Sequence, residues 1–516
     1  MFCALAAIGA VETHTRFDDL LETKAAEASQ LVGPDDDFAE FPDGPVTVDG
    51  SGSSLEPIDP ALRTESTKDP NVPWVLPESA GTPWSAQDKS DGLLTFRGNP
   101  TRTFYGSGPI PESPQLAWST TIGCSTSAVG TEAKNWCGTG WTGQPAIFRP
   151  PGQTNGWWLA VGGYNKAVNF YDPRTGEEVY DKYVTGDIIK GSVAADPDGF
   201  PLLYTGSRDG FFHIVATDQD EPTVLWKLSA DAIQPTKWNN DWDSSALVLE
   251  DFLFVGGENS RFFIVKLNRN FDDNDNVIVN PEVVFSAPSW DDQILAEVGD
   301  EEMSIENSVA ISGDVVYFAN SAGLVQGWSI KGLEAGVEPE QVFRYWTGDD
   351  TDASIVIDEE GMLYVGSEFE RDTTRSRELG QVFKLDPSNP DDPLVWSREA
   401  NNGVESGVWA TPALYEDLVV VSTNDGRVLG LDRVTGDELW VLNLPGPLWS
   451  SPIVIDGVLL QGDCAGFLHA FKLVPDGAPE EMWAFEVEGC IESTPAVWGG
   501  EIFVGTRGGD FYAIND

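Results

Sequence analysis

Positive charge is scarce in this 516-residue chain. Its 30 Lys and Arg and 3 His stand against 84 Asp and Glu, which gives a formal net charge of −54 at pH 7. Nucleic acids and anionic membrane surfaces are bound through clustered Lys and Arg, so the composition argues against nucleic acid as a partner. We interpret the acidity as a solvating coat or an adaptation to salt, and the alternative is attraction of cations or basic partners.

Long apolar runs are also missing. The stretch over residues 2–11 (FCALAAIGAV) has about the length of a signal-peptide core and is too short to span a bilayer. No basic residue precedes it, so we expect residues 1–32 to be a truncated signal or anchor of an exported protein, with a plain hydrophobic terminus as the alternative. Cys3 in this stretch leaves membrane anchorage through a lipid open.

Cysteines are few, and none of the five belongs to a CxxC or zinc-like spacing. Four of them fall into two pairs, Cys124 with Cys137 and Cys464 with Cys490. Two disulfides in an oxidising compartment fit this arrangement better than metal ligation does. We therefore predict an extracytoplasmic protein that is secreted or anchored at the cell envelope.

The motifs of hydrolytic and metal chemistry are absent from the sequence as well. Its three histidines are too scattered for a metal cluster, and no GxSxG elbow occurs. His213 and His469 occupy the same position of two repeats, which favours a packing role. Paired carboxylates for glycoside cleavage arise by chance in so acidic a chain, so that signal is nonspecific.

Composition separates residues 33–90 from the rest of the chain. This segment is rich in Asp, Ser, Gly and Pro and has too little apolar surface to fold, so we predict an extended acidic linker. The chain as a whole has 53 Gly and 19 Trp, which is typical of a folded protein with many tight turns. We place a single folded domain at residues 91–516.

A repeated hairpin dominates this domain. Eight pairs of short strands with Gly, Asn or Asp in their turns each follow a small-residue step, and the mean spacing of these steps from Pro145 to Pro495 is about 50 residues, the length of one four-stranded propeller blade. An aromatic residue ends seven of the repeats, and the eighth lacks its fourth strand. We predict that the segment around Trp118 supplies it. The predicted fold class is all-β, an eight-bladed β-propeller of four-stranded antiparallel blades whose last blade is closed by an N-terminal strand.

These repeats resemble a known family. The segment LLTFRGNPTRTFYGSGP, the Asp-x-x-Thr-Gly endings at Asp172 and Asp432, and the blade STPAVWGGEIFVGTRGGDFYAI are similar to the pyrroloquinoline-quinone (PQQ)-like β-propeller repeats. The resemblance implies two kinds of function. Some members are quinoprotein dehydrogenases, and others are catalytically silent scaffolds such as the propeller lipoprotein of the outer-membrane β-barrel assembly machine. The fold does not decide between them.

The links between predicted blades define the mouth of the central channel. They are rich in carboxylates and Trp, and Lys190 is their only Lys. An acidic ring with aromatic plates suits a divalent cation, a cationic group on Trp faces or a stacked polyol; the alternative is a solvated rim with Trp packed between blades. The candidate binding residues are Lys190, Asp241, Trp242, Asp243, Glu306, Asn307, Asp349, Asp352, Glu405, Trp409, Trp449 and Glu492.

A quinoprotein dehydrogenase would need a calcium ion, a base and an aromatic platform for the quinone. Glu306, Asn307 and Asp352 are the candidate calcium ligands, and Trp242 or Trp409 is the candidate platform. The alcohol dehydrogenases of the family typically carry adjacent cysteines, and this chain has no such pair. We therefore expect no cofactor, with calcium as a candidate ion and PQQ as the alternative.

Two further features lie in hairpins. In NFDDNDNVIV, the residues Asp272, Asn274 and Asn276 alternate as in the first part of a calcium loop, and an Asx-rich turn is the alternative. The hairpin over residues 368–380 holds three arginines, the one basic cluster of the chain. We interpret it as a contact surface, and the alternative is that it neutralises neighbouring acids.

Together these patterns predict an exported, monomeric, non-enzymatic scaffold that binds protein partners or a small ligand at the propeller mouth. The alternative is a PQQ- and calcium-dependent dehydrogenase of alcohols or sugars. Both disulfides are expected to staple the mouth where the ring closes.

Overall fold

The computed structural model describes residues 68–69, 71–84, 91–129, 132–151, 156–403, 406–475 and 477–516. The predicted signal or anchor over residues 1–32, with Cys3, and the linker up to residue 67 lie outside this part of the chain. No helix in the described part is long and apolar enough to cross a membrane.

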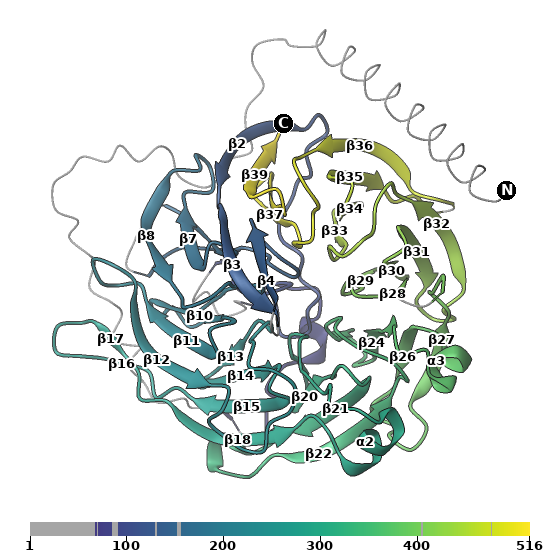
Figure 1. Ribbon diagram of the computed structural model, residues 1–516, viewed down its shortest axis with the longest axis horizontal. Helices are drawn as coiled ribbons and strands as arrows, with labels where there is room; N and C mark the ends of the chain where they lie inside the picture. Colours follow the sequence, from purple (N-terminus) through teal and green to yellow (C-terminus); the bar gives the residue numbers. More distant parts are fainter. Residues whose placement is uncertain are drawn as a thin grey trace, which may run out of the picture.

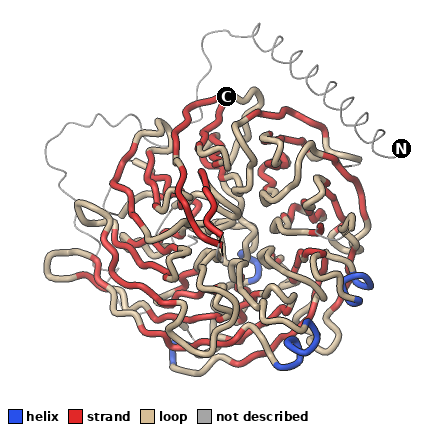
Figure 2. The backbone as a smooth tube through the Cα atoms, in the orientation of Figure 1, coloured by secondary structure: helices blue, strands red, loops and turns tan. Residues whose placement is uncertain are grey.

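Eight four-stranded antiparallel sheets form a closed ring, which confirms the predicted propeller (Figure 1). Strands account for most of the regular structure, and the few helices lie at the rim and near the centre (Figure 2). Short turns join consecutive strands, so each blade is a meander whose first strand lines the channel. Apolar side chains fill the space between neighbouring blades, as in the cluster that joins blades 2 and 3.

The first four blades follow in chain order. Blade 1 contains β5 (Ala146–Phe148), β6 (Trp158–Gly163), β7 (Ala167–Tyr171) and β8 (Glu178–Val184), with β1 (Gly92–Leu93) added beside β5. Blade 2 contains β9 (Ala194–Ala195), β10 (Leu202–Gly206), β11 (Phe211–Ala216) and β12 (Thr223–Ser229). Blade 3 contains β13 (Leu247–Leu249), β14 (Phe252–Gly257), β15 (Arg261–Lys266) and β18 (Glu282–Pro288). Blade 4 contains β19 (Ala310–Ser312), β20 (Val315–Phe318), β21 (Leu324–Ser329) and β22 (Glu340–Trp346).

The remaining blades complete the circle. Blade 5 contains β23 (Val356–Ile357), β24 (Leu363–Gly366), β26 (Val382–Leu385) and β27 (Leu394–Arg398). Blade 6 contains β29 (Ala413–Tyr415), β30 (Leu418–Ser422), β31 (Arg427–Asp432) and β32 (Glu438–Asn443). Blade 7 contains β33 (Ile453–Ile455), β34 (Val458–Gly462), β35 (Phe467–Lys472) and β36 (Glu480–Glu486). Blade 8 contains β37 (Ala496–Trp498), β38 (Glu501–Gly505), β39 (Asp510–Asn515) and β2 (Gln115–Thr121).

Short elements are inserted between these strands. The hairpins are β3 (Cys124–Val129) with β4 (Glu132–Cys137), β16 (Asn270–Phe271) with β17 (Val277–Ile278), and β25 (Glu368–Phe369) with β28 (Ser406–Gly407). The helices are α2 (Asp292–Val298), α3 (Thr374–Leu379) and the 3-10 turns η2 (Pro77–Ser79) and η3 (Leu333–Ala335).

Blade 8 is closed by a strand from the amino-terminal side, as predicted. Strand β2 pairs with β39 from Gln115 opposite Asn515 to Thr121 opposite Asp510, and the two lie side by side in Figure 1. The Trp118 ring packs on Phe511 with the ring centroids 6.1 Å apart. The closing blade therefore has the same four strands as the others, and neither end of the chain leaves an open sheet in the ring.

Each fourth strand carries a β-bulge that the sequence did not reveal. One extra residue interrupts the pairing directly before the aromatic that ends the repeat, and it is apolar in every blade. A bulge bends its strand and increases the local twist, so it turns the aromatic onto the blade and makes the edge strand a poor template for pairing. The extra residues are Val179, Leu225, Val284, Val342, Val395, Leu439, Met482 and Ala117.

The Asp-x-x-Thr-Gly motif joins one blade to the next. The Asp172 carboxylate accepts hydrogen bonds from backbone N–H groups in its turn, and Gly176 has a φ of +71°. A Cβ at Gly176 would lie 2.6 Å from the indole of Trp118 in the preceding blade. The Trp118 Nε1 donates to the Pro173 carbonyl at 2.8 Å, so the glycine makes room for the aromatic of its neighbour.

The small-residue steps before the inner strands also join the blades. The backbone N–H of Ser245 donates to the Ser308 hydroxyl at 2.9 Å, and that of Ser308 donates to the Ser354 hydroxyl at 2.9 Å. Ser354 and Thr411 continue the chain, so hydrogen bonds run from blade to blade around the channel. A hydroxyl at this repeat position therefore satisfies a backbone donor of the preceding blade.

Residues 93–109 plug the channel, a role that sequence reasoning missed. The Arg97 and Arg102 side chains in this segment are fully buried. Arg97 donates to the carbonyls of Thr411, Pro412 and Pro452, and Arg102 donates to carbonyls of blades 3 and 4. Two guanidinium groups thus tie the inner strands of several blades together. The sequence signal that could have indicated this role is the presence of two arginines beside Gly-Asn-Pro in so acidic a chain.

Part of the range predicted as linker packs against the propeller. The Trp74 ring is buried against Phe252, with centroids 5.7 Å apart, and its Nε1 donates to the Ile330 carbonyl at 3.0 Å. Val75 forms an isolated bridge with Gly313 of blade 4. In the described range 71–84, the chain therefore extends the folded unit before residue 91.

Candidate functional site

One face of the ring gathers the links between blades and the turns between second and third strands. The first strand of each blade starts at the link, and the second runs back, so its turn returns to the same face. We call it the mouth face. All four cysteines of the predicted pairs and every described candidate binding residue of the links belong to elements of this face. Glu405 lies outside the described residues.

Lys190 lies among three carboxylates, which we call the lysine cluster. Its Nζ forms an ion pair with Asp243, lies 3.1 Å from the Glu258 Oε1 and 4.0 Å from the Asp241 Oδ2. These three acids place one carboxylate oxygen each within 4.8 Å of one another. Arg208 pairs with Asp241 from the outer side. The acids of this cluster therefore have cationic partners within the chain.

Burial and charge act against each other in the lysine cluster. Burial raises the pKa of Glu258 well above its usual range, although Lys190 opposes the shift. Burial disfavours the Lys190 ammonium, but Asp243 and Glu258 outweigh it and raise the pKa of Lys190 well above its usual value. The ammonium is thus held charged by its anionic neighbours.

Blades 4 and 5 supply a second group, the carboxylate cluster of Glu306, Asp350, Asp352 and Glu368. The last three again place one oxygen each within 4.8 Å of one another. Arg371 is the cation near them, and its Nη1 lies 3.5 Å from the Asp350 Oδ2. The Oδ1 atoms of Asp350 and Asp352 are buried without a hydrogen-bond partner.

The acids of this cluster are buried close together, and they raise each other's pKa. Burial, followed by the charge of Asp352, raises the pKa of Glu306 to about 8. Burial and then Asp350 raise the pKa of Asp352 well above its usual range, and burial and then Asp352 do the same for Glu368. Three carboxylate oxygens so close together suit a divalent cation or an ammonium group, because either would add to the counter-charge that Arg371 supplies at Asp350.

Two candidate residues hold the loops in place. The Asn307 amide donates to the carbonyls of Ala319 and Thr351, and its oxygen accepts from the Ala319 N–H at 3.1 Å. The Asp349 carboxylate accepts from the backbone N–H groups of Asp350, Arg371 and Asp372. These side-chain atoms satisfy buried backbone groups, so both residues position the carboxylate cluster.

The tryptophans of the mouth lie in different environments. Trp242 is fully buried between Phe212 and Phe263, with ring centroids 5.8 and 5.5 Å away. Its packing leaves no ring face for a planar ligand. Trp409 and Trp449 are half-buried and lie against each other with centroids 5.2 Å apart. This pair is therefore the aromatic surface that the predicted Trp residues offer to the mouth.

Glu492 pairs with an arginine that sequence reasoning did not select. The Arg507 Nη1 lies 2.9 and 3.1 Å from the two Glu492 oxygens. The guanidinium also lies over the rings of Trp136 and Tyr164, 4.9 Å from each centroid. Arg507 lies in the turn of the final repeat. Its position after a Gly-Thr step was the only sequence signal that could have marked it as a site residue.

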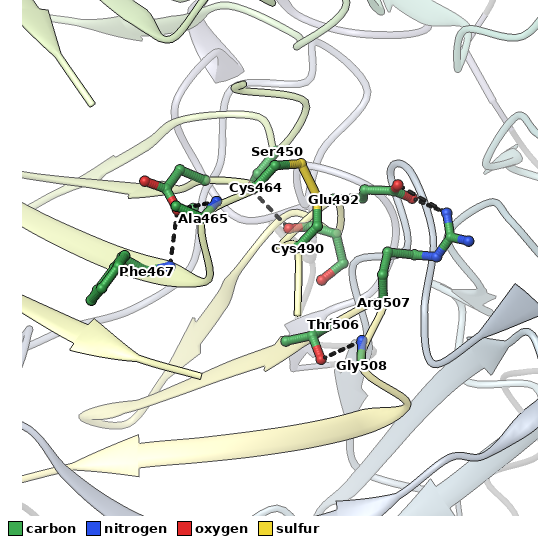
Figure 3. The surroundings of a disulfide bond; sticks show 12 residues. Ser450, Cys464, Ala465, Phe467, Cys490, Glu492, Thr506, Arg507 and Gly508 are labelled. Carbon is green, nitrogen blue, oxygen red and sulfur yellow. Dashed lines mark hydrogen bonds and ion pairs between the residues drawn. A yellow bond between two sulfur atoms is a disulfide. The ribbon is translucent and has the colours of Figure 1, made fainter. Parts of the chain in front are cut away.

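Both predicted disulfides are present. Cys124 and Cys137 are bonded at the base of the β3–β4 hairpin, where they face each other across the strands. Cys464 and Cys490 are bonded beside Arg507 and Glu492 (Figure 3). The link that carries Cys124 and Cys137 is a regular hairpin, and Figure 1 shows it running inward from the rim beside β2.

The hairpin that resembles the first part of a calcium loop forms a local turn around Asp272. The Asp272 Oδ1 accepts from the backbone N–H groups of Asn274 and Asn276 at 2.8 and 2.9 Å, the geometry of an Asx-rich turn. These hydrogen bonds lower the pKa of Asp272. Calcium binding there stays a prediction, and the turn already uses one of the oxygens that an ion would need.

The basic cluster of blade 5 has partners within the chain. Arg371 pairs with Asp300, Glu302 and Asp350, and Arg377 pairs with Asp372. The Arg375 Nε donates to the Trp346 carbonyl at 2.7 Å. The geometry therefore matches the alternative that these arginines neutralise neighbouring acids.

The two histidines of the propeller domain are buried, as their shared repeat position predicted. The His213 Nδ1 lies 2.7 Å from the Tyr183 hydroxyl, and its Nε2 lies 3.0 Å from the Asp209 carboxylate. The His469 Nε2 lies 3.1 Å from Asp463. Both rings thus hold a turn of their blade through a carboxylate.

Sequence comparison identifies related proteins over part of the chain. Residues 378–470 match the sequence model of the family described as outer membrane protein assembly factor BamB. Over 141 residues, or 27% of this chain, the sequence is 29% identical to the outer membrane protein assembly factor BamB of Nitrosomonas eutropha. This match spans 31% of that protein's length.

Solved structures share the architecture. The crystal structure of BamB from Moraxella catarrhalis has a TM-score of 0.52 at 16% identity, and the match covers 78% of this chain and 100% of that one. The quinohemoprotein alcohol dehydrogenase from Comamonas testosteroni has a TM-score of 0.57 at 13% identity, with 85% and 84% covered. A europium-containing methanol dehydrogenase has a TM-score of 0.54 at 13% identity, with 84% and 99% covered. At these identities the likeness concerns the fold. The predicted resemblance to the PQQ-like β-propeller repeat family is confirmed by the BamB match and by the eight-bladed ring.

Proposed function

We propose that this chain is a non-catalytic propeller of the cell envelope that docks a protein partner on its mouth face. In this proposal a basic side chain of the partner enters the carboxylate cluster. The observation that carries the proposal is that one arrangement of three carboxylates, which we call a cage, occurs in two blades. Asp241 and Asp243 with Glu258 in blade 3 have the same placement in their repeat as Asp350 and Asp352 with Glu368 in blade 5.

The first cage contains an ammonium group from the same chain, whereas the cation described beside the second is the Arg371 guanidinium at Asp350. Lys190 supplies that group from the step before blade 2. At the equivalent step before blade 4, the chain has Glu306. The second cage therefore has an additional acid where the first has the lysine, and the cation described beside it is Arg371 at Asp350. A cation from outside would add counter-charge at Asp352 and Glu368.

Location at the envelope is supported by two lines. The match to BamB concerns a protein whose name places it in outer-membrane assembly. Two disulfides favour an oxidising compartment. The half-buried Trp409 and Trp449 would add an aromatic surface for the partner's apolar or cationic side chains.

A direct test is calorimetric titration of the protein with a short oligolysine peptide. We expect binding that weakens as salt is added, because the contact is between charges. The double variant Asp352→Asn/Glu368→Gln should lose it. Glu360→Gln on the opposite face, where Glu360 pairs with Arg433, is the matched control and should bind as the wild type does. Equal binding by both variants would contradict the proposal.

The second candidate is a calcium-dependent quinoprotein, which the carboxylate cluster and the dehydrogenase fold favour. Glu306, Asp350, Asp352 and Glu368 offer the oxygen ligands that a divalent ion prefers. When bound, the quinone would accept the electrons of a substrate alcohol. Trp242 does not fit as its platform, because both sides of the ring are packed.

The two candidates separate in one titration with PQQ, with and without calcium. Calcium-dependent, stoichiometric uptake with dye reduction by alcohols or sugars would replace the docking proposal. Oligolysine binding without uptake of PQQ would support it.

A further inference from the structure

We propose that the two disulfides act together as a redox latch that holds the β3–β4 hairpin over the mouth through Arg507. The inference does not depend on which ligand the mouth takes. It rests on the turn over residues 506–509 between β38 and β39 of the closing blade, because this turn lies between the two disulfides.

The hairpin disulfide contacts one side of the turn. The Gly123 N–H, next to Cys124, donates to the Gly509 carbonyl at 3.0 Å, and the Thr139 N–H donates to the Thr506 carbonyl at 3.3 Å. A Cβ at Gly138 would lie 1.7 Å from that carbonyl oxygen. The residues on either side of Cys124–Cys137 thus lie directly on the turn, and glycine permits the approach.

The second disulfide contacts the other side. The Arg507 N–H donates to the Cys490 carbonyl at 2.9 Å, and the Thr506 hydroxyl donates to the Glu488 carbonyl at 2.6 Å. A Cβ at Gly508 would lie 2.2 Å from the same Glu488 oxygen. Figure 3 shows the Cys464–Cys490 bond, Glu492 and the turn residues grouped around Arg507.

Each disulfide positions one partner of the Arg507 side chain. Glu492, which forms the ion pair, is two residues from Cys490, and Trp136, which lies under the guanidinium, is next to Cys137. A disulfide restricts the conformations of its neighbouring backbone. Arg507 therefore joins the two cross-linked segments by an ion pair on one side and a cation–π contact on the other.

The hairpin also contacts blades 1 and 2. Trp136 contacts Tyr164 of blade 1 with ring centroids 5.3 Å apart, and Arg208 of blade 2 lies 5.1 Å from its centroid. The Ser125 hydroxyl donates to the Tyr164 carbonyl. The hairpin thus lies on the turns of blades 8, 1 and 2, next to the lysine cluster through Arg208 and Asp241.

The switch is thiol–disulfide exchange. A dithiol reductant attacks each disulfide and is oxidised to its own disulfide, while the protein disulfide takes two electrons and two protons and becomes two thiols. Both cysteines of the second pair are half-buried, so the bond is within reach of a reductant. Loss of both bonds frees Glu492 and Trp136 to separate, and the hairpin then swings away from the turns.

Hydrogen exchange of the full chain tests the latch. In the oxidised protein we expect slow exchange of peptides that cover residues 132–138 and 505–511. Removal of both pairs (Cys124→Ser/Cys137→Ser with Cys464→Ser/Cys490→Ser) should accelerate exchange in 132–138 by about tenfold or more, and removal of either pair alone should give less. Arg507→Ala should reproduce the acceleration with both disulfides intact, and the exposed Arg174→Ala should not.

Three outcomes would overturn the latch. The first is unchanged exchange of the hairpin after both disulfides are removed. The second is an Arg507→Ala variant that exchanges like the wild type. The third is equal acceleration in blade 4, for which a peptide over residues 310–329 is the reference, because that would show a general loss of structure. Acceleration confined to the hairpin and the turn supports it.

Discussion

The lysine cluster and the carboxylate cluster are built alike and differ in the sign of one neighbour. Each has an Asp-x-Asp pair before an inner strand and a Glu after the second strand of the same blade. At the preceding step of the ring, Lys190 faces the first cage, and the second has Glu306. The side chain at this step therefore adds a cation to the first cage and a fourth acid to the second, beside which Arg371 is the described cation.

The charged neighbours of a repeat position belong partly to another blade. Asp241, Asp243 and Glu258 of blade 3 have the repeat positions of Asp350, Asp352 and Glu368 of blade 5, although Asp352 is only half-buried. Lys190 and Arg208 of blade 2 pair with the first cage, and Trp136 of the β3–β4 hairpin contacts Arg208. The same repeat positions thus hold acids that pair with Lys190 in one place and acids that lie beside Glu306 in the other.

The largest effect is expected from breaking the first cage. Lys190→Met leaves three buried carboxylates without their ammonium, and removing one partner of a buried ion pair costs about 3–5 kcal/mol. Chemical denaturation at pH 7 should show a loss of unfolding free energy of this size. Lys472→Met removes an exposed lysine of blade 7 and is the control; an equally small effect of both changes would mean that the cage does not need its cation.

A lysine placed in the second cage should have a smaller and opposite effect. Glu306→Lys places an ammonium where blade 2 has Lys190, so it should raise the unfolding free energy by about 1–2 kcal/mol and abolish oligolysine binding. Thermal unfolding and calorimetry measure the two results. A destabilised variant with unchanged binding would show that the two cages are not equivalent.

Stability should also depend on pH through the second cage. The pKa of Glu306 is raised to about 8 in the fold, whereas an unfolded Glu titrates near 4.3. Between these values the folded state binds more protons, so the unfolding free energy is highest below the lower value and falls as pH rises through 8, by about 1.4 kcal/mol per unit of pKa difference at most. Denaturation of the wild type and of Glu306→Gln from pH 4 to 9 measures this; a variant with the same slope as the wild type would contradict it.

The smallest effect is expected at the rim of blade 5. Arg377 and Asp372 form an exposed pair, and such pairs contribute little. Arg377→Ala should therefore leave the melting temperature unchanged within error. Arg371→Ala, which removes the cation beside Asp350, should lower it. Equal shifts in differential scanning calorimetry would show that burial does not separate these two arginines.

Much of the fold could be predicted from the sequence because it is local and repeated. Gly-rich turns, strands of alternating pattern and the aromatic of each fourth strand recur with a fixed spacing, and the incomplete final repeat required a strand from elsewhere. The pairing of Cys124 with Cys137 and of Cys464 with Cys490 was predicted correctly. Cys124 and Cys137 belong to one link, and Cys464 and Cys490 belong to a turn of blade 7 and to the link that leaves this blade.

The candidate site was predicted less completely. The sequence pointed to Lys190, Asp241, Asp243, Glu306 and Asp352, which the structure places in the two clusters. It missed Glu258 and Glu368, because these lie after second strands in the middle of each repeat and reach the mouth only through the return of the strand. It also named Trp242, whose ring lies between blades.

By itself the sequence determined the number of blades, the closure of the ring and the acidity of its mouth, because periodicity and composition are properties of the chain alone. Only the tertiary structure decided that Lys190 neutralises the acids of the next blade, that Arg97 and Arg102 plug the channel, and that Arg507 lies between two disulfides. The physical reason is that these contacts join residues tens to hundreds of positions apart. Their distances are set by the curvature of the ring and the reach of each side chain, which no local pattern records.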